Sequence, residues 1–330
     1  MDGNSPRALI KALLRGEPPP RPLLMPIIVS VGSRLESLPL RDFQRNPTRI
    51  SNALRQIRSV LKVDGLACYF DPLLEIEALG GKIEWLDGSA TLAVSPCSDV
   101  HDLEKLPSPQ EVAQYERVRV GADVLHRLRT ILHDDPALMV GVTGPLKLAA
   151  QLLGPNNVSL DALQFASEVS AAVCKTFLES GADVVFLAET FLPQMSPELW
   201  LHWVSLLDPL INVVRFYESL PVLLLRASAV EGLGAFLSRQ WDCVLCPASE
   251  DADAWQGHRA SQRFLGIAWP TKFRWKAIDS SYNSTVTISQ VLHSERPILL
   301  LSTGDLPSGC DLKQLSSMLA TMRTGLLRAV

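Results

Sequence analysis

The strongest constraint on the fold of this sequence is a series of eight short apolar runs spread along its 330 residues. The runs do not alternate between apolar and polar residues, which is typical of strands that are buried on both faces, as in a parallel sheet. They occupy residues 23–31, 65–70, 137–142, 183–188, 221–225, 241–245, 263–268 and 297–301. The sequence therefore predicts eight buried parallel strands.

Amphipathic stretches that begin and end with helix signals separate these runs. A polar side chain just before a helix, or a proline at its first position, deals with the backbone N–H groups that lack partners there. The start signals are Asn46-Pro47, Ser159, Ser196-Pro197-Glu198 and Asp311. They predict helices from 47 to about 60, from 160 to 180 before Gly181, from 197 onwards, and from 312 to about 327.

Strands that alternate with helices in this way predict an α/β fold, a (β/α)8 TIM barrel. A doubly wound open sheet is the alternative, but its usual G-x-G-x-x-G after the first strand is absent. We expect a single domain over residues 1–330, with an N-terminal helical extension at 1–22. The insertion at 72–109 is too long for one helix, and we expect either a lid or hairpin over the mouth or an excursion without a role.

Composition excludes several classes of protein. Hydrophobic residues make up 47% of the chain and the net charge is −4, which argues against disorder and against a basic nucleic-acid-binding surface. No apolar run reaches the roughly 18–20 residues that a membrane-spanning helix needs. The N-terminus lacks the pattern of a secretory signal, and six cysteines in 330 residues do not suggest a disulfide framework. We therefore expect a reduced, cytoplasmic protein.

Charged residues at the ends of the predicted strands are the candidates for catalysis, because barrels of this type build their active sites there. Asp71 and Glu189 are the predicted catalytic residues, although Asp71 could also cap a loop and Glu189 could be paired. Arg226 needs an anionic partner inside its strand, either one of these carboxylates or a substrate carboxylate. The predicted substrate-binding residues are Arg34, Tyr69, Thr143, Lys147, Arg226, Ser228, Trp269 and Asp305.

Histidine and cysteine positions argue against a metal site. All six histidines fall in predicted helices or connecting segments, so neither a catalytic triad nor a histidine-rich metal site is expected. Cys243 and Cys246 straddle the sixth strand, where residues three apart face opposite sides. We therefore predict no bound metal and no cofactor.

Several segments occur together in an order that is typical of a known family. YFDPLLEIEALGGKIEW (69–85) contains Asp71, GVTGPLKLAAQLL (141–153) follows the third strand, and GADVVFLAE (181–189) forms the fourth. With PVLLLRAS and the C-terminal STGDLPSGCDLKQLSSML, these segments resemble the uroporphyrinogen decarboxylase superfamily. The resemblance implies a (β/α)8 barrel and places Asp71 on the family's catalytic aspartate.

The resemblance implies two chemistries. One is cofactor-free decarboxylation of the acetate groups of uroporphyrinogen, in which the aspartate stabilises a protonated pyrrole and arginines bind carboxylates. The other is methyl transfer between a corrinoid protein and a thiol, with a zinc ion held by a His-x-Cys pair and a C-terminal cysteine. Here Leu225 and Ala227 occupy the His-x-Cys positions and only Cys310 matches, while Gln151 replaces the decarboxylase tyrosine.

The sequence thus favours metal-free, decarboxylase-type lyase chemistry on an anionic small molecule, with a tetrapyrrole-like molecule as a candidate. Asp71 would be the acid or the stabiliser of a cationic intermediate, and Arg34 and Arg226 would anchor anions. The alternatives are methyl transfer with a corrinoid or a methylated aromatic substrate, and a non-catalytic barrel that binds a tetrapyrrole or a partner. We expect no nucleic-acid or membrane partner, and a homodimer is possible by family analogy.

Overall fold

A parallel sheet forms the centre of the molecule. The computed structural model describes residues 5–17, 19–21, 23–86, 89–133, 135–189, 195–225, 243–247, 264–269, 299–302, 305–306 and 309–327. Within these residues the sheet has eight parallel strands in the order β1-β10-β9-β8-β7-β6-β5-β2. The strands are β1 (Leu23–Leu24), β2 (Gly65–Tyr69), β5 (Ala137–Thr143), β6 (Val184–Glu189), β7 (Leu220–Leu225), β8 (Cys243–Pro247), β9 (Phe264–Trp269) and β10 (Leu299–Ser302).

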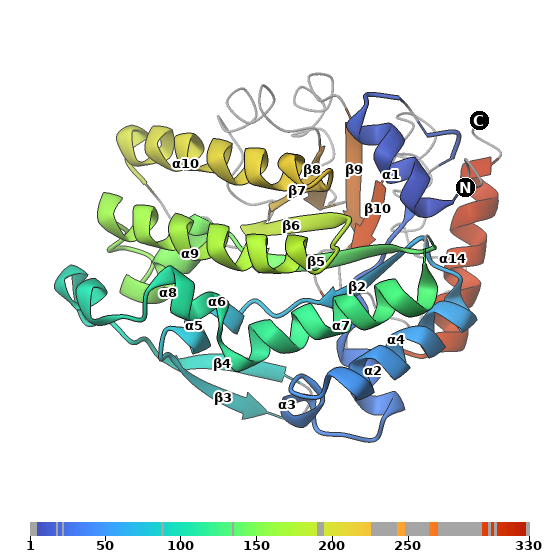
Figure 1. Ribbon diagram of the computed structural model, residues 1–330, viewed down its shortest axis with the longest axis horizontal. Coiled ribbons are helices and arrows are strands. Elements are labelled where there is room, and N and C mark those ends of the chain that lie inside the picture. The colour runs from blue at the N-terminus through green and yellow to red at the C-terminus, as the bar shows by residue number, and fades with distance from the viewer. Residues whose placement is uncertain are drawn as a thin grey trace, which may run out of the picture.

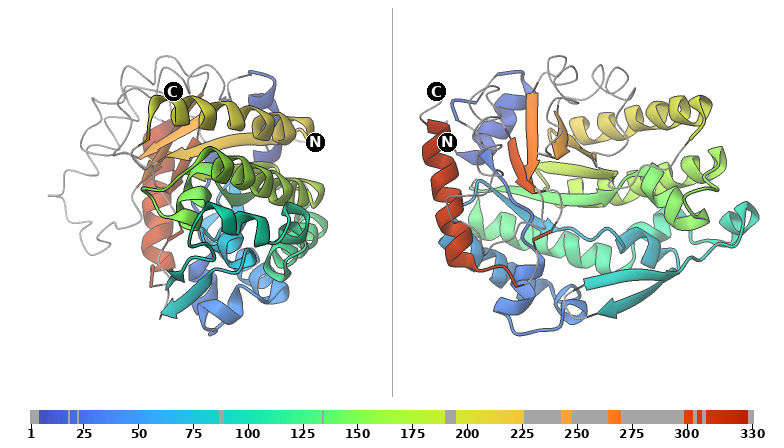
Figure 2. Two further views of the ribbon diagram at one scale, coloured as in Figure 1. Left: turned by 90° about the vertical axis from the view of Figure 1, so that its left-hand side faces the viewer. Right: turned by 180° about the vertical axis from the view of Figure 1, so that it is seen from behind.

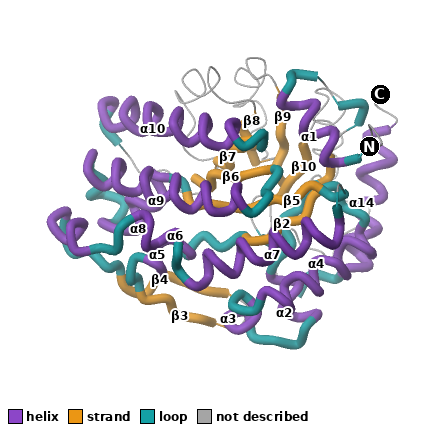
Figure 3. The backbone as a smooth tube through the Cα atoms, viewed as in Figure 1, coloured by secondary structure: helices purple, strands orange, loops and turns teal. Residues whose placement is uncertain are grey.

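Strand pairing follows the order of a barrel. Within this sheet, each strand from β2 to β10 pairs in parallel with the next strand of the sheet along the chain, and β10 pairs with β1. Between β1 and β2, the backbone N–H of Asp64 donates to the carbonyl of Leu24 at 2.8 Å. The predicted (β/α)8 TIM barrel is the fold of this chain, and Figure 3 shows the strands inside a shell of helices.

A layer of helices covers the outside of the sheet. In Figure 1, α10, α9, α7 and α4 lie side by side, and α14 packs beside α4 at the C-terminus. Their bounds are α4 (Pro47–Leu61), α7 (Glu116–Leu132), α9 (Leu160–Glu179), α10 (Pro197–Phe216) and α14 (Leu312–Leu327). Among the described helices, none combines the length and the apolar character needed to cross a bilayer.

The predicted helix signals are confirmed. The side chains of Asn46, Ser159 and Ser196 each accept a hydrogen bond from a backbone N–H in the first turn of α4, α9 and α10. Gly181 follows α9 with φ +96°, a conformation that favours glycine and ends the helix. Local capping chemistry therefore sets these boundaries, as the sequence predicted.

The first apolar run differs from its prediction, because only two of its nine residues form ladder pairs. Pro26 has no N–H to donate, and neighbouring backbone groups bind elsewhere. The N–H of Ile27 donates to the Ser302 hydroxyl at 2.9 Å, and the carbonyl of Ile27 accepts from the N–H of Leu306 at 2.9 Å. The chain then enters α2 (Ser30–Leu35).

The insertion at 72–109 has its own secondary structure. Its elements are α5 (Leu74–Ala78), the antiparallel strands β3 (Lys82–Leu86) and β4 (Ser89–Val94), and the 3-10 helix η1 (Val100–Lys105). Figure 2 shows the hairpin as a separate pair at the edge of the molecule, apart from the parallel strands. α6 (Pro109–Ala113) then leads into α7.

Buried aspartates bind neighbouring strands where the parallel strands begin. Asp183, just before β6, accepts from the N–H of Leu138 at 2.8 Å and pairs with Arg129 at 2.6 Å and Arg7 at 2.9 Å. Arg7 lies on α1 (Pro6–Leu14), so this ion pair attaches the N-terminal helix to the base of the sheet. Asp64 similarly accepts from the N–H of Leu24 at 2.8 Å.

Removing the Asp183 carboxylate should destabilise the protein strongly. Asp183→Ala removes the carboxylate that Arg7, Arg129 and the N–H of Leu138 share. We therefore expect a loss of about 3–5 kcal/mol in the free energy of unfolding, measured with urea. Asp123, which pairs with Arg127 on the surface of α7, is the matched control. Its alanine variant should lose less than about 1 kcal/mol, and equal losses would contradict this role of Asp183.

Candidate active site

Asp71 lies directly beyond the C-terminal end of β2 and is held on both carboxylate oxygens. Oδ1 accepts from the N–H of Leu73 at 2.9 Å, and Oδ2 forms an ion pair with Arg117 of α7. The side chain of Asp71 is 5% exposed. Its orientation is therefore fixed by the protein, which is what a catalytic carboxylate requires.

Arg117 is buried completely and is the centre of a polar cluster. Besides Asp71, its guanidinium donates to the carboxylate of Glu77 on α5, to the side-chain oxygen of Gln44 and, at 3.1 Å, to the hydroxyl of Tyr69. Burial opposes the charge of Arg117, but the nearby Tyr69, Asp71 and Glu77 leave its pKa raised above the ordinary value. The two carboxylates therefore compensate the buried positive charge.

Tyr69, predicted to bind substrate, belongs to this supporting cluster. Its hydroxyl donates to the carbonyl of Gln44 at 3.0 Å and accepts from Arg117, and the residue is 1% exposed. Burial raises the pKa of the Tyr69 hydroxyl, so it stays protonated. Its contacts indicate that it helps to position Arg117.

Thr143, at the C-terminal end of β5, binds a second buried carboxylate. Glu75 of α5 accepts from the N–H of Thr143 at 3.0 Å and from its hydroxyl at 2.6 Å. Burial raises the pKa of Glu75, and the negative charge of Asp71 adds to the effect. These two hydrogen bonds tie α5 to the end of β5.

Glu189, the second predicted catalytic residue, ends β6 beneath the start of α8 (Pro145–Leu153). Its oxygens accept from the N–H groups of Leu146 at 2.9 Å and Lys147 at 2.8 Å, and from the indole N–H of Trp203 at 2.9 Å. Burial raises its pKa from the ordinary 4.5 to about 7, although these donors favour the ionised form. Glu189 thus caps α8 and orients the helix that carries Lys147.

Gly144 permits this close approach. A Cβ built at this position would lie 2.3 Å from Cδ of Glu189. The glycine in the motif GVTGP therefore leaves space for a carboxylate, and Pro145 then occupies the first position of α8. Lys147, two residues after Pro145, is 9% exposed.

Asp305, Arg34 and Cys310 lie together beyond the ends of β1 and β10. Asp305 accepts from the N–H of Val29 at 2.7 Å, from the N–H of Ser30 at 2.8 Å and from the Ser30 hydroxyl, and so caps α2. Arg34, exposed on α2, donates to the carbonyl of Cys310 at 2.6 Å. Burial raises the pKa of Asp305 from 3.8 to about 7, and the charge of Asp71 contributes.

Three of the predicted residues cannot be placed as side chains. Arg226 and Ser228 lie outside the described residues, and Trp269 is described only as the last backbone position of β9. The predicted pairing of Arg226 therefore stays a prediction. Within the part of the chain that the structure describes, no three His, Cys, Asp or Glu side chains are grouped so that they could hold a metal ion.

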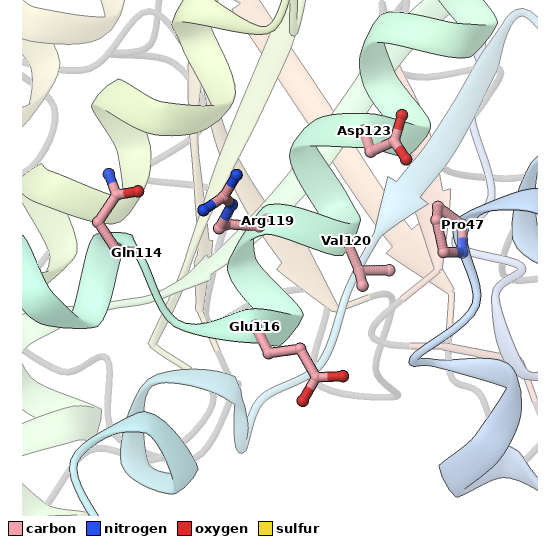
Figure 4. A pocket seen from close by; sticks show the side chains of 6 residues that line it. All are labelled: Pro47, Gln114, Glu116, Arg119, Val120 and Asp123. Atoms are coloured by element: carbon pink, nitrogen blue, oxygen red, sulfur yellow. The ribbon is translucent and has the colours of Figure 1, made fainter.

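A pocket of about 580 Å³ lies in the helical layer, not among the predicted site residues. Figure 4 shows its lining between the first residue of α4 and the first turns of α7. The lining residues are Pro47, Gln114, Glu116, Arg119, Val120 and Asp123. Arg119 lies on the exposed side of α7, whereas Arg117 is buried.

Sequence reasoning missed Arg117 and Glu75. Arg117 falls on the buried face of α7, in helical register with Gly121 and Val124, and Glu75 falls among apolar residues of α5. A charged residue at a core position must be paired or functional, so an amphipathic plot of these helices could have found both.

Charged residues at the C-terminal ends of the strands are the arrangement from which (β/α)8 barrel enzymes build their active sites. The profile of the family described as uroporphyrinogen decarboxylase (URO-D) matches residues 5–224, two thirds of the chain. The chain therefore belongs to the uroporphyrinogen decarboxylase family, whose members are enzymes. No curated protein sequence matches it.

The solved structure of a methyltransferase supports the fold. A methyltransferase from Methanosarcina mazei superimposes with a TM-score of 0.77 at 17% identity, covering 98% of each chain. A putative vitamin-B12-independent methionine synthase from Listeria monocytogenes gives 0.48 at 11% identity over 93% of this chain and 95% of that chain. A dihydrodipicolinate synthase from Agrobacterium tumefaciens gives 0.46 at 11% identity over 97% and 80%. At these identities the likeness concerns the fold alone.

The space at Gly144 can be tested by adding one methyl group. Gly144→Ala places Cβ against Glu189 and should destabilise the protein by about 1–3 kcal/mol, measured by urea unfolding. Gly309→Ala is the control, because nothing lies within 4 Å of a Cβ built there. A Gly144→Ala variant as stable as the Gly309→Ala variant would show that Glu189 does not approach this backbone.

The raised pKa of Glu189 predicts a pH dependence of stability. The native state binds the proton more tightly than the unfolded chain, so this stabilising contribution is complete below about pH 4.5 and is lost as the pH rises through about 7. Between about pH 4 and about pH 8, the wild type should lose up to about 3 kcal/mol more than Glu189→Gln, which cannot ionise. Parallel unfolding curves for the two proteins across this range would contradict the prediction.

Proposed function

We propose that this protein is a lyase that decarboxylates an anionic small molecule at the mouth of the barrel, with a tetrapyrrole-like substrate as the leading candidate. The observation that carries the proposal is the Asp71 carboxylate, fixed on both oxygens at the end of β2. Its position in the YFDPLLEIEALGG segment corresponds to the catalytic aspartate that the family resemblance implies.

Asp71 would stabilise positive charge on the substrate. In such a reaction a substrate ring takes up a proton and becomes an electron sink, the bond to the carboxylate breaks and CO2 leaves. The carbon then gains a proton and the ring releases the proton that it took up, so that an acetate group becomes a methyl group with a net uptake of one proton. A preoriented negative charge near the ring favours the cationic intermediate, because the carboxylate does not have to change its orientation during the reaction.

Cations at the mouth would bind the substrate's carboxylates. Arg34 is exposed beside Asp305 and Cys310, and its guanidinium can make paired hydrogen bonds to a carboxylate. Lys147, oriented by the capping of α8, is a further candidate, and Arg226 and Ser228 remain proposed from the sequence. Trp269 and Thr143, at the ends of their strands, are proposed to line the same mouth.

Methyl transfer is the second candidate, and Cys310 is the observation that favours it, because the resemblance places it on a zinc ligand of the methyltransferases. The zinc site itself does not fit this chain, since Leu225 and Ala227 at the other two ligand positions carry no donor side chain. Burial also raises the pKa of the Cys310 thiol to about 11, which disfavours the thiolate that binds metal.

Asp71→Asn tests the proposed chemistry, because it keeps the shape of the side chain and removes its charge. With uroporphyrinogen as the probe under anaerobic conditions, we expect the wild type to release CO2 and Asp71→Asn to do so roughly 100-fold more slowly. Asp123→Asn, on the surface of α7, is the control and should match the wild type. An Asp71→Asn variant with full turnover would refute the proposed role.

A second assay separates the alternatives. The same preparations are mixed with methylcobalamin and a small thiol that can accept the methyl group. The visible absorption of the cobalamin changes when the methyl group is transferred to the thiol, and the zinc content of the preparations is measured. Demethylation with stoichiometric zinc and without CO2 release would overturn the lyase proposal in favour of methyl transfer. Saturable binding of uroporphyrinogen without either reaction would indicate a non-catalytic barrel.

A further inference from the structure

The β3–β4 hairpin has one side directed at the body of the barrel. Ile83, Trp85, Ala90 and Leu92 are partly buried, while the residues that alternate with them are exposed. Ile83, Ala90 and Leu92 pack against the hydrophobic core. Trp85 instead lies over a charged group: the centre of the Arg117 guanidinium is 5.3 Å from its ring.

The guanidinium of Arg117 is in contact with two aromatic rings. The ring of Tyr69 lies 5.8 Å from the guanidinium, in addition to that of Trp85. An arginine cation over an aromatic face is attracted by the negative face of the ring, and the attraction is larger where water is excluded. Here Arg117 is 0% exposed, so Trp85 both attracts the guanidinium and excludes solvent from it.

One continuous segment supplies most of the partners of Arg117. Tyr69, Asp71, Glu77 and Trp85 all lie between residues 69 and 85, on β2, in the connection that follows it, on α5 and on β3. The insertion therefore turns back on α7 and wraps the arginine that holds Asp71. A displacement of the hairpin would therefore move Arg117 and, through it, the Asp71 carboxylate.

We propose that the β3–β4 hairpin is part of the active site: Trp85 holds Arg117 against Asp71, and Arg117 is the positioning residue for that carboxylate. This inference rests on the proposed catalytic role of Asp71. Arg117 itself reaches no solvent and contacts no substrate. The insertion thus influences the position of Asp71 through the buried ion pair between Arg117 and Asp71.

Kinetics of four variants test the proposal. Arg117→Lys keeps the charge but loses the fork that bridges Asp71 and Glu77, and Trp85→Leu removes the aromatic face from a half-buried surface position. We expect each to lower kcat roughly 10- to 100-fold with KM unchanged, because substrate-binding groups are untouched. Trp85→Phe should restore most of the rate lost in Trp85→Leu.

Arg119→Lys is the matched control, the same substitution two residues along α7 at an exposed position (Figure 4). It should leave kcat and KM unchanged. A Trp85→Leu variant with wild-type kcat, or one in which KM alone rises, would overturn the proposal. So would equal effects of Arg117→Lys and Arg119→Lys.

A second readout needs no turnover. In protein labelled with 13C at aspartate carboxyl carbons, the Asp71 signal is identified as the one absent from Asp71→Asn. Trp85→Leu and Arg117→Lys should both move this signal, the double variant should move it no further than Arg117→Lys alone, and Arg119→Lys should leave it in place. An Asp71 signal unmoved in Trp85→Leu refutes the link, whereas a moved signal in a protein without CO2 release refutes only the proposed function.

Discussion

Burial of carboxylates at the ends of strands is the interaction on which the rest of this structure depends. At the base of the sheet Asp64 and Asp183 accept backbone N–H groups from the neighbouring strand, and at the mouth Glu189 and Asp305 accept those of α8 and α2. A buried carboxylate is tolerated only when donors surround it, and a backbone N–H without a partner is equally unfavourable. Each group therefore satisfies the other and ties a strand to the element beside it.

At the mouth, the ion pair between Asp71 and Arg117 differs from these capping interactions. Glu189 and Asp305 serve mainly as caps, because their oxygens are occupied by backbone donors and neighbouring side chains. Asp71 is instead held by a guanidinium and a single N–H, in a cluster whose charges compensate each other. That difference supports assigning the chemistry to Asp71 and the orientation of Arg34 and Lys147 to the capping carboxylates.

Much of the fold could be predicted because its determinants are local in sequence. The capping residues Asn46, Ser159 and Ser196 satisfy N–H groups within three positions, so their effect does not depend on the rest of the chain. The run at 23–31 was less predictable, because its ladder is replaced by contacts with Ser302 and Asp305, about 275 residues away. Apolar character shows that such a segment is buried, but not which groups will take its hydrogen bonds.

The sequence by itself determined the alternation of strands and helices, the family resemblance and the placement of Asp71, Glu189 and Asp305 at or beyond strand ends. It could do so because hydrophobic periodicity and strand direction are local properties. Only the tertiary structure decided what each carboxylate does. Whether a carboxylate caps a helix or awaits a substrate depends on which donors reach it from elsewhere, such as Arg117, 46 residues beyond Asp71. These contacts between donors and carboxylates arise from tertiary packing, and no local sequence pattern predicts them directly.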